Sequence, residues 1–264
     1  MINREDPRSR VAPRLGHPRL DPGTRSPLQW SVVIPAYNEA HRLPRYLDAV
    51  VAYFDGRGQP YEVIVVDDGS TDETADVVER LGRRHPEVRV IRSGRNQGKG
   101  AAVRKGMLVA RGDWRLFADA DGATPITELK RLEAALAAGA DVAIGSRGLL
   151  DASVSLQTRP HRVMAGRLFN WIVGRTGLSG IHDSQCGFKA FTAAAANTLF
   201  PQMTIEGFGF DVELLLRARR TGFKVVELAV NWADQPGSKS SVLRDGPQMM
   251  WQILRARSRL GKTG

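Results

Sequence analysis

The chain alternates between short, continuously apolar runs and segments whose apolar residues recur every three or four positions. The apolar runs predict buried strands at 31–34, 63–66, 88–93 and 114–121. The segments between them predict helices over 41–55, over 73–85 and after the glycines of 96–100. In the first of these helices one face carries Leu43, Leu47, Val50, Val51 and Phe54. Regular alternation of strand and helix predicts a mostly parallel sheet covered by helices.

The second half of the chain is less regular and has no internal repeat. Its pattern predicts a helix over 128–140, a strand over 141–147, a helical stretch over 159–178, a strand at the end of 183–192, a helix over 207–222 and a strand over 223–232. We therefore expect one α/β domain over 30–242. A disordered tail rich in Pro and Arg (1–29) precedes it, and a basic amphipathic segment (243–264) follows it.

Carboxylates cluster where the predicted strands end. Glu39 follows the first strand, Asp67 and Asp68 end the second, and Asp119 and Asp121 end the fourth. Ligands of parallel α/β sheets bind beyond the carboxyl ends of the strands. These acidic residues therefore predict a binding site at that edge of the sheet.

Asp119 and Asp121 lie two positions apart, so their side chains point to the same side of an extended chain. Two neighbouring carboxylates repel each other unless a cation lies between them. Hard divalent ions bind carboxylate oxygens together with phosphate oxygens and water. The pair thus favours Mg²⁺ or Mn²⁺ held with a diphosphate, although a polar loop with two capping carboxylates would give the same short pattern.

Two glycine-containing segments adjoin these carboxylates. In "VVDDGSTD", Asp67 and Asp68 are able to accept from a base N–H or from ribose hydroxyls, or they only cap the helix that follows. In "NQGKGAA", Lys99 stands between glycines ahead of a helix, where backbone and cation can meet a phosphate. The spacing is not that of a Walker motif.

Charge and cysteine content narrow the class of protein. The net charge is +10, and the two ends, 1–29 and 244–264, carry +3 and +4 of it. The nearly balanced middle argues against a nucleic-acid groove, whereas basic ends suit anionic membrane surfaces or remain solvated. The single cysteine, Cys186, excludes an internal disulfide framework and favours a reducing compartment. No apolar run reaches 18 residues, so the sequence predicts no spanning helix.

Eight motifs in this order resemble one known family. They are "SVVIPAYNE", "VIVVDDGSTDET", "NQGKGAAVRKGM", "ADADGATP", "IGSR", "DSQCGFKAF", "GFGFDVELL" and "VNWADQPGSK". Together they are similar to the family 2 inverting glycosyltransferases of GT-A (Rossmann-like) fold, and most of all to the dolichyl-phosphate and polyprenyl-phosphate β-glucosyltransferases. The resemblance covers about residues 30–242.

The resemblance implies a role for each strand-end residue. Asp119 and Asp121 would bind Mg²⁺ or Mn²⁺, with Asp121 the better ligand, and Asp183 matches the position often proposed as catalytic base. Cations expected near donor or acceptor phosphates are Arg147, Arg162, Lys189 and Lys239. The residues expected to bind the nucleotide sugar are Pro35, Ala36, Tyr37, Glu39, Asp67, Asp68, Lys99, Asp119 and Ala120.

The expected reaction transfers a hexose, with glucose favoured, from a UDP-sugar to a polyprenyl phosphate with inversion. A lipid phosphate is largely ionised at neutral pH, so Asp183 orients the acceptor or a cation as readily as it takes a proton. We expect a cytoplasmic protein that is peripheral to the membrane, with the segment 243–264 either in the interface or packed on the domain. One alternative is a soluble family 2 enzyme with a hydroxyl acceptor, and another is a UDP-N-acetylhexosamine donor in place of UDP-glucose.

Overall fold

The computed structural model describes residues 28–149, 151–157, 174–235, 249 and 252–253. The tail 1–27, most of the predicted helical stretch 159–178 and most of the segment 243–264 lie outside the described residues, as do Arg162 and Lys239. No helix in the described part of the chain is long and apolar enough to cross a membrane.

The first half folds as the pattern predicts, with strands and helices in alternation. The elements are β1 (Trp30–Ala36), α1 (Leu43–Asp55), β2 (Tyr61–Asp67), α2 (Thr74–Gly82), β3 (Val88–Arg92), α3 (Lys99–Val109), β4 (Trp114–Ala118), α4 (Leu129–Ala137) and β5 (Val142–Ser146). The predicted fourth strand, 114–121, is three residues too long, because the chain turns at Gly122, whose φ is +64°.

The second half supplies shorter elements and one helix that the pattern does not predict. These elements are β6 (Leu156–Gln157), β7 (Phe188–Thr192), α6 (Ala193–Leu199), α7 (Phe210–Arg220), β8 (Val225–Ala229) and β9 (Trp232–Ala233). α6 begins where the Thr192 hydroxyl accepts a hydrogen bond from the Ala195 N–H at 3.2 Å, which caps the helix.

Seven strands form one sheet in the order β3-β2-β1-β4-β7-β5-β8. Every neighbouring pair is parallel except those made by β7, which runs antiparallel to β4 and to β5. The sheet is thus mostly parallel, with one reversed strand near its centre. This reversal brings the start of β7 to the edge where β4 and β5 end, since Phe188 pairs with Ala118.

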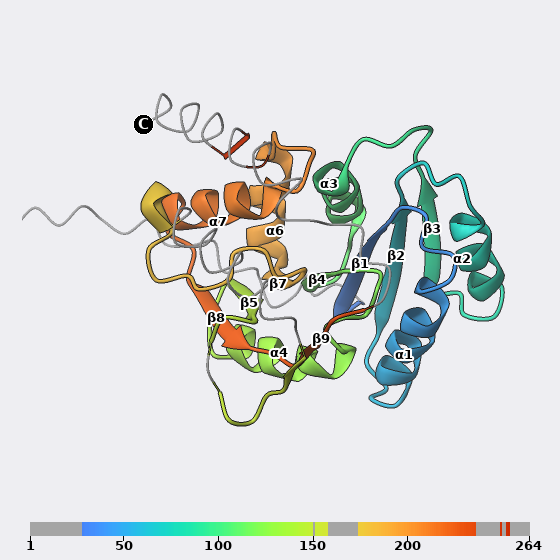
Figure 1. Cartoon of the computed structure of the whole chain (residues 1–264). Helices are drawn as coiled ribbons and strands as arrows, with labels where there is room; N and C mark the ends of the chain where they lie inside the picture. Colours follow the sequence, from blue (N-terminus) through green and yellow to red (C-terminus); the bar gives the residue numbers. More distant parts are fainter. Residues whose placement is uncertain (1–27, 150, 158–173, 236–248, 250–251, 254–264) are drawn as a thin grey trace, which may run out of the picture.

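Helices cover both faces of the sheet (Figure 1). α1, α2 and α4 pack on one face, where Phe54 is fully buried, and α3, α6 and α7 pack on the other. Complete burial of a side chain of this size stabilises the fold by about 1.5–3 kcal/mol. Met249 and Ile253, from the predicted C-terminal segment, are buried in the second core. These two residues therefore pack against the domain.

Candidate active site

The loops that follow β1 and β2 are tied together at the carboxyl edge of the sheet. The Asn38 N–H donates to the Ser70 hydroxyl at 2.9 Å, and the Asn38 side-chain oxygen accepts from the Thr71 N–H at 2.8 Å. Asn38 has a left-handed backbone (φ 54°), which asparagine adopts more readily than most residues. The Glu39 N–H donates to the Thr74 hydroxyl at 2.7 Å. The predicted nucleoside-binding loops thus form one connected surface.

Asp68 connects this surface to a third loop, the one ahead of α3. Its carboxylate accepts from the Gln97 N–H at 3.0 Å and from the Gly98 N–H at 2.7 Å. Burial raises the pKa of Asp68 despite these two donors. Asp67 accepts from the Ser70 N–H at 3.1 Å, as a residue that shapes a turn does. Pro35 and Ala36 are buried in β1, whereas Tyr37 is 39% exposed and faces solvent.

Asp119 lies where three segments of the chain meet. Its carboxylate pairs with the Lys99 ammonium at 2.6 Å, and its N–H donates to the Gly187 carbonyl at 3.0 Å. A Cβ at position 187 would lie 2.0 Å from the Asp119 carboxylate, so a larger residue there would displace this side chain. Asp121, two residues on, accepts from the Ala123 N–H at 3.0 Å, and Ala120 between them is buried.

These two carboxylates fit a divalent cation that is shared with a substrate. Burial raises the pKa of Asp121, and the Asp119 charge raises it further, so a cation beside both would relieve their repulsion. In the described part of the chain, no group of three or more His, Cys, Asp or Glu side chains could hold a metal. A cation on these two carboxylates would bind further oxygens from water or a substrate, as Mg²⁺ in particular favours.

Asp183 and Arg147 form a second charged pair at the same edge. The Asp183 carboxylate accepts from Arg147 three times: from Nε at 2.7 Å, from Nη2 at 3.0 Å and from the backbone N–H at 3.0 Å. Burial opposes the charge, yet Arg147 outweighs it and lowers the pKa of Asp183 to about 2. A carboxylate of such low basicity is a poor proton acceptor at neutral pH. In this structure Asp183 holds Arg147 in place.

The Arg147 side chain keeps access to solvent beside an aromatic ring. Its side chain is 36% exposed, and its guanidinium carbon lies 5.5 Å from the centre of the Trp232 ring. Arginine in such a fixed position presents several N–H donors to a phosphate. The pair thus places a cation close enough to Asp119 for the Asp119 charge to help raise the pKa of Arg147, after the larger effect of Asp183.

Lys189, which the resemblance places near a donor or acceptor phosphate, lies in the interior of the domain in this structure. Its side chain is fully buried, and its ammonium donates to Asp211 at 2.6 Å and to the Cys186 carbonyl at 2.6 Å. A completely buried lysine needs charged or hydrogen-bonding partners, and in this structure Lys189 finds them inside the domain.

Two site residues have no counterpart among the sequence predictions. Glu227 in β8 accepts from the Asp183 N–H at 2.8 Å and from the His182 N–H at 2.9 Å, which fixes the loop before β7. Asp211, at the start of α7, pairs with Lys189. The sequence signal for Glu227 was a carboxylate within an alternating strand. The signal for Asp211 was a carboxylate within the motif "GFGFDVELL".

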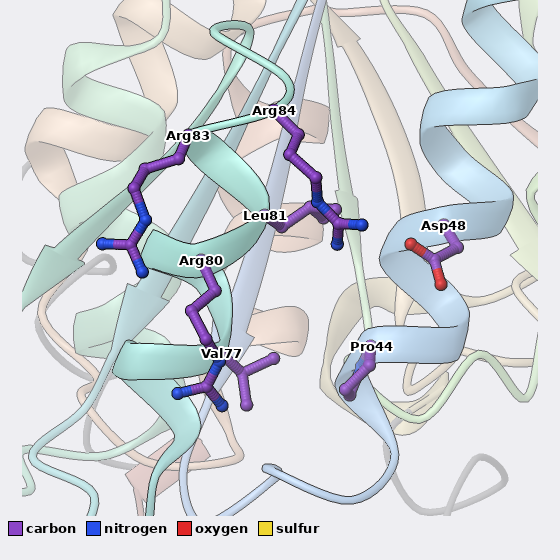
Figure 2. Close-up of a pocket in the computed structure, with 7 residues that line it drawn as sticks. All are labelled: Pro44, Asp48, Val77, Arg80, Leu81, Arg83 and Arg84. Atoms are coloured by element: carbon purple, nitrogen blue, oxygen red, sulfur yellow. The ribbon is translucent and has the colours of Figure 1, made fainter.

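A hollow of about 560 Å³ between α1 and α2 is separate from these residues (Figure 2). It is lined by Pro44, Asp48, Val77, Arg80, Leu81, Arg83 and Arg84. No predicted site residue borders it, and its walls carry none of the paired carboxylates described above. The candidate site at the carboxyl edge of the sheet therefore does not include this hollow.

The fold and the paired carboxylates at this edge define a glycosyltransferase of the GT-A fold. Residues 31–200 match the family model described as glycosyl transferase family 2. The chain belongs to this family, as its motifs predict.

Named relatives share a large part of the sequence. A dolichyl-phosphate beta-glucosyltransferase of Trichomonas vaginalis is 39% identical over 80% of this chain and 65% of its own length. Proteins of the same name from Drosophila melanogaster and Homo sapiens are 42% and 40% identical, each over 80% of this chain and 69% of the relative. The chain thus spans about two thirds of the length of these relatives.

Solved structures share the fold at lower identity. Glucosyl-3-phosphoglycerate synthase from Mycobacterium tuberculosis, in complex with Mn²⁺, UDP and phosphoglyceric acid, superimposes with a TM-score of 0.64 at 21% identity, over 87% of this chain and 77% of that chain. Mannosyl-3-phosphoglycerate synthase from Rubrobacter xylanophilus gives 0.66 at 22% identity, over 89% and 74%. The predicted fold class is confirmed.

Proposed function

We propose that the chain transfers glucose from UDP-glucose to a polyprenyl phosphate of the dolichyl type, with inversion at the anomeric carbon. The observation that carries this proposal is the identity of about 40% with dolichyl-phosphate beta-glucosyltransferases over 80% of the chain. The strand-end carboxylates and the Arg147–Asp183 pair supply the chemistry that such a transfer needs.

The donor lies along the carboxyl edge in this proposal. Pro35, Tyr37 and Glu39 border the uridine, and Asp68 holds two loops of its pocket together. Lys99 and Asp119 face the diphosphate. Mg²⁺ or Mn²⁺ on Asp119 and Asp121 would neutralise the charge that grows on the UDP leaving group. The Mn²⁺ and UDP named with the structure from Mycobacterium tuberculosis support a divalent ion with this fold.

The acceptor phosphate approaches Arg147 from the sugar face opposite UDP. Its second pKa lies near 6, so the attacking oxygen is already an anion at neutral pH. Asp183, whose pKa is about 2 beside Arg147, then orients this arginine rather than removing a proton. Arg162 and Lys239 are further candidates for acceptor contacts. The basic segment 243–264 would attach the protein peripherally to the cytoplasmic membrane face.

A transfer assay tests the proposal. Purified protein is incubated with Mn²⁺, polyprenyl phosphate and one radiolabelled UDP-sugar at a time, and label is counted after extraction into organic solvent. We expect label from UDP-glucose in the solvent phase, and none with Asp121→Asn. Label from UDP-N-acetylglucosamine instead would correct the donor. Transfer only to water-soluble hydroxyl acceptors would refute the lipid acceptor.

A further inference from the structure

A buried ion pair lies behind the candidate site. Asp211 is 2% exposed and Lys189 is not exposed at all, and their charged atoms are 2.6 Å apart. Burying two charges costs free energy that hydrophobic residues of similar volume would not cost. Neither residue contacts the donor or the acceptor in the proposed function. We therefore asked what other role this pair has.

The glycines of "NQGKGAA" bring α3 against the start of α7. A Cβ at Gly98 would lie 2.6 Å from the Glu206 carbonyl oxygen, and one at Gly100 would lie 2.5 Å from the Ile205 carbonyl oxygen. The Ala101 N–H donates to that same Glu206 carbonyl at 3.1 Å. The two glycines flank Lys99, and a Cβ at Gly100 would lie 2.8 Å from the Cβ of Phe210, so the chain beside Lys99 packs against the residue that precedes Asp211.

The result is a row of alternating charges that leads from the interior to the site. Lys189 pairs with Asp211, the Asp211 charge acts on Lys99, and Lys99 pairs with Asp119 at 2.6 Å. The charges of two carboxylates, Asp119 and Asp211, thus act on Lys99. One of these carboxylates, Asp119, would also bind the divalent ion.

We propose that Asp211, held by Lys189, is a positioning residue that keeps Lys99 directed at the donor diphosphate once a metal ion engages Asp119. This inference rests on the proposed function of the site. The ammonium has three N–H donors on a flexible stem. With a metal ion on Asp119, the charge of Asp211 would still act on Lys99, and the ammonium would offer its N–H donors to phosphate oxygens.

The test compares UDP with uridine, because only UDP carries the phosphates that Lys99 would contact. Affinities are measured by calorimetry in Mn²⁺ for wild type, Asp211→Asn, Lys99→Met and the double variant. We expect Asp211→Asn to weaken UDP binding about tenfold and to leave uridine binding unchanged. In the Lys99→Met background the same change has no further effect, as a coupled pair requires. Asp211→Glu restores part of the UDP affinity.

Equal weakening of UDP and uridine, or additive effects in the double variant, would overturn the inference, because both indicate a general structural role. If Asp211→Asn does not fold, Gly100→Ala tests the same contact by pushing α3 from α7, with Gly94→Ala as control, since a Cβ at Gly94 meets nothing within 4 Å. Selective loss of UDP affinity in Gly100→Ala alone supports the inference, and its absence refutes it. If the variants show this pattern but the protein transfers nothing to polyprenyl phosphate, the proposed acceptor is refuted and the role of Asp211 stands.

Discussion

Replacing Asp183 by Asn separates the role of this carboxylate in stability from its role in chemistry. Arg147 lowers the pKa of Asp183 from 3.8 to about 2 against the effect of burial. The Asp183 side chain is only 3% exposed, whereas that of Arg147 is 36% exposed, so solvent screens the pair in part. A shift of this size corresponds to about 2 kcal/mol of stability at neutral pH.

The sign of the pH dependence follows from the lowered pKa. The contribution is complete above the unfolded-state pKa near 4 and disappears as pH falls through about 2. Urea unfolding should therefore show wild type more stable than Asp183→Asn by about 2 kcal/mol at pH 7, with the difference shrinking below about pH 4. A difference that is constant from pH 7 to pH 3 would show that the loss has another origin.

The same variant distinguishes an orienting carboxylate from a general base. With polyprenyl phosphate as acceptor, kcat/KM should rise through about pH 6 in both proteins, because the ionising group belongs to the acceptor. Asn still accepts one hydrogen bond from Arg147, so partial activity should remain. The assay is kcat/KM between pH 5 and 8. A loss of about a hundredfold or more at every pH, with a wild-type profile that follows a carboxylate, would refute this reasoning.

Three further predictions concern the metal, the donor pocket and the membrane. Asp121→Asn should abolish transfer and weaken binding of UDP-glucose in Mn²⁺, whereas Asp151→Asn, at a carboxylate that contacts Ser153 and Arg131, should change neither; full activity in excess chelator would contradict this. Asp68→Ala removes the acceptor for the Gln97 and Gly98 N–H groups, so the donor KM should rise and the preference for uridine should weaken, and unchanged UDP affinity in calorimetry would count against it. Replacing Arg255, Arg257, Arg259 and Lys262 with glutamine should reduce sedimentation with anionic vesicles. UDP binding should stay intact, because Met249 and Ile253 still pack in the core. A wild-type protein that does not sediment with such vesicles at low salt would refute membrane attachment by this segment.

The first half of the fold could be predicted because each element there has its own pattern. Apolar runs gave the strands, and helical spacing such as that of Leu47, Val50 and Phe54 gave the helices. Parallel strands then place Asp68 and Asp119 at one edge without further information. This part of the site follows from local periodicity and one topological rule.

The rest depended on contacts that no local pattern records. The direction of β7 is set by its two neighbours, and only this reversal delivers Asp183 to the edge where Arg147 lies. Lys189 was expected to contact a phosphate, because nothing local in the sequence shows that Asp211, 22 positions later, pairs with it. α6 begins with four alanines that have no amphipathic period, so its capping residue, Thr192, was the only local sign of it.

The reversed strand β7 also divides the sheet into two modules. Strands β3, β2, β1 and β4 are all parallel and carry the loops assigned to the donor. Beyond β7, the second module supplies Arg147 and Asp183, which are assigned to the acceptor. An ancestral protein of this plan could exchange its acceptor module and keep its donor module, provided that the β4–β7 ladder and the packing of Gly100 against Phe210 of α7 survived. New acceptors would then evolve by replacement of one side of the sheet, while the machinery that activates the sugar nucleotide stayed the same.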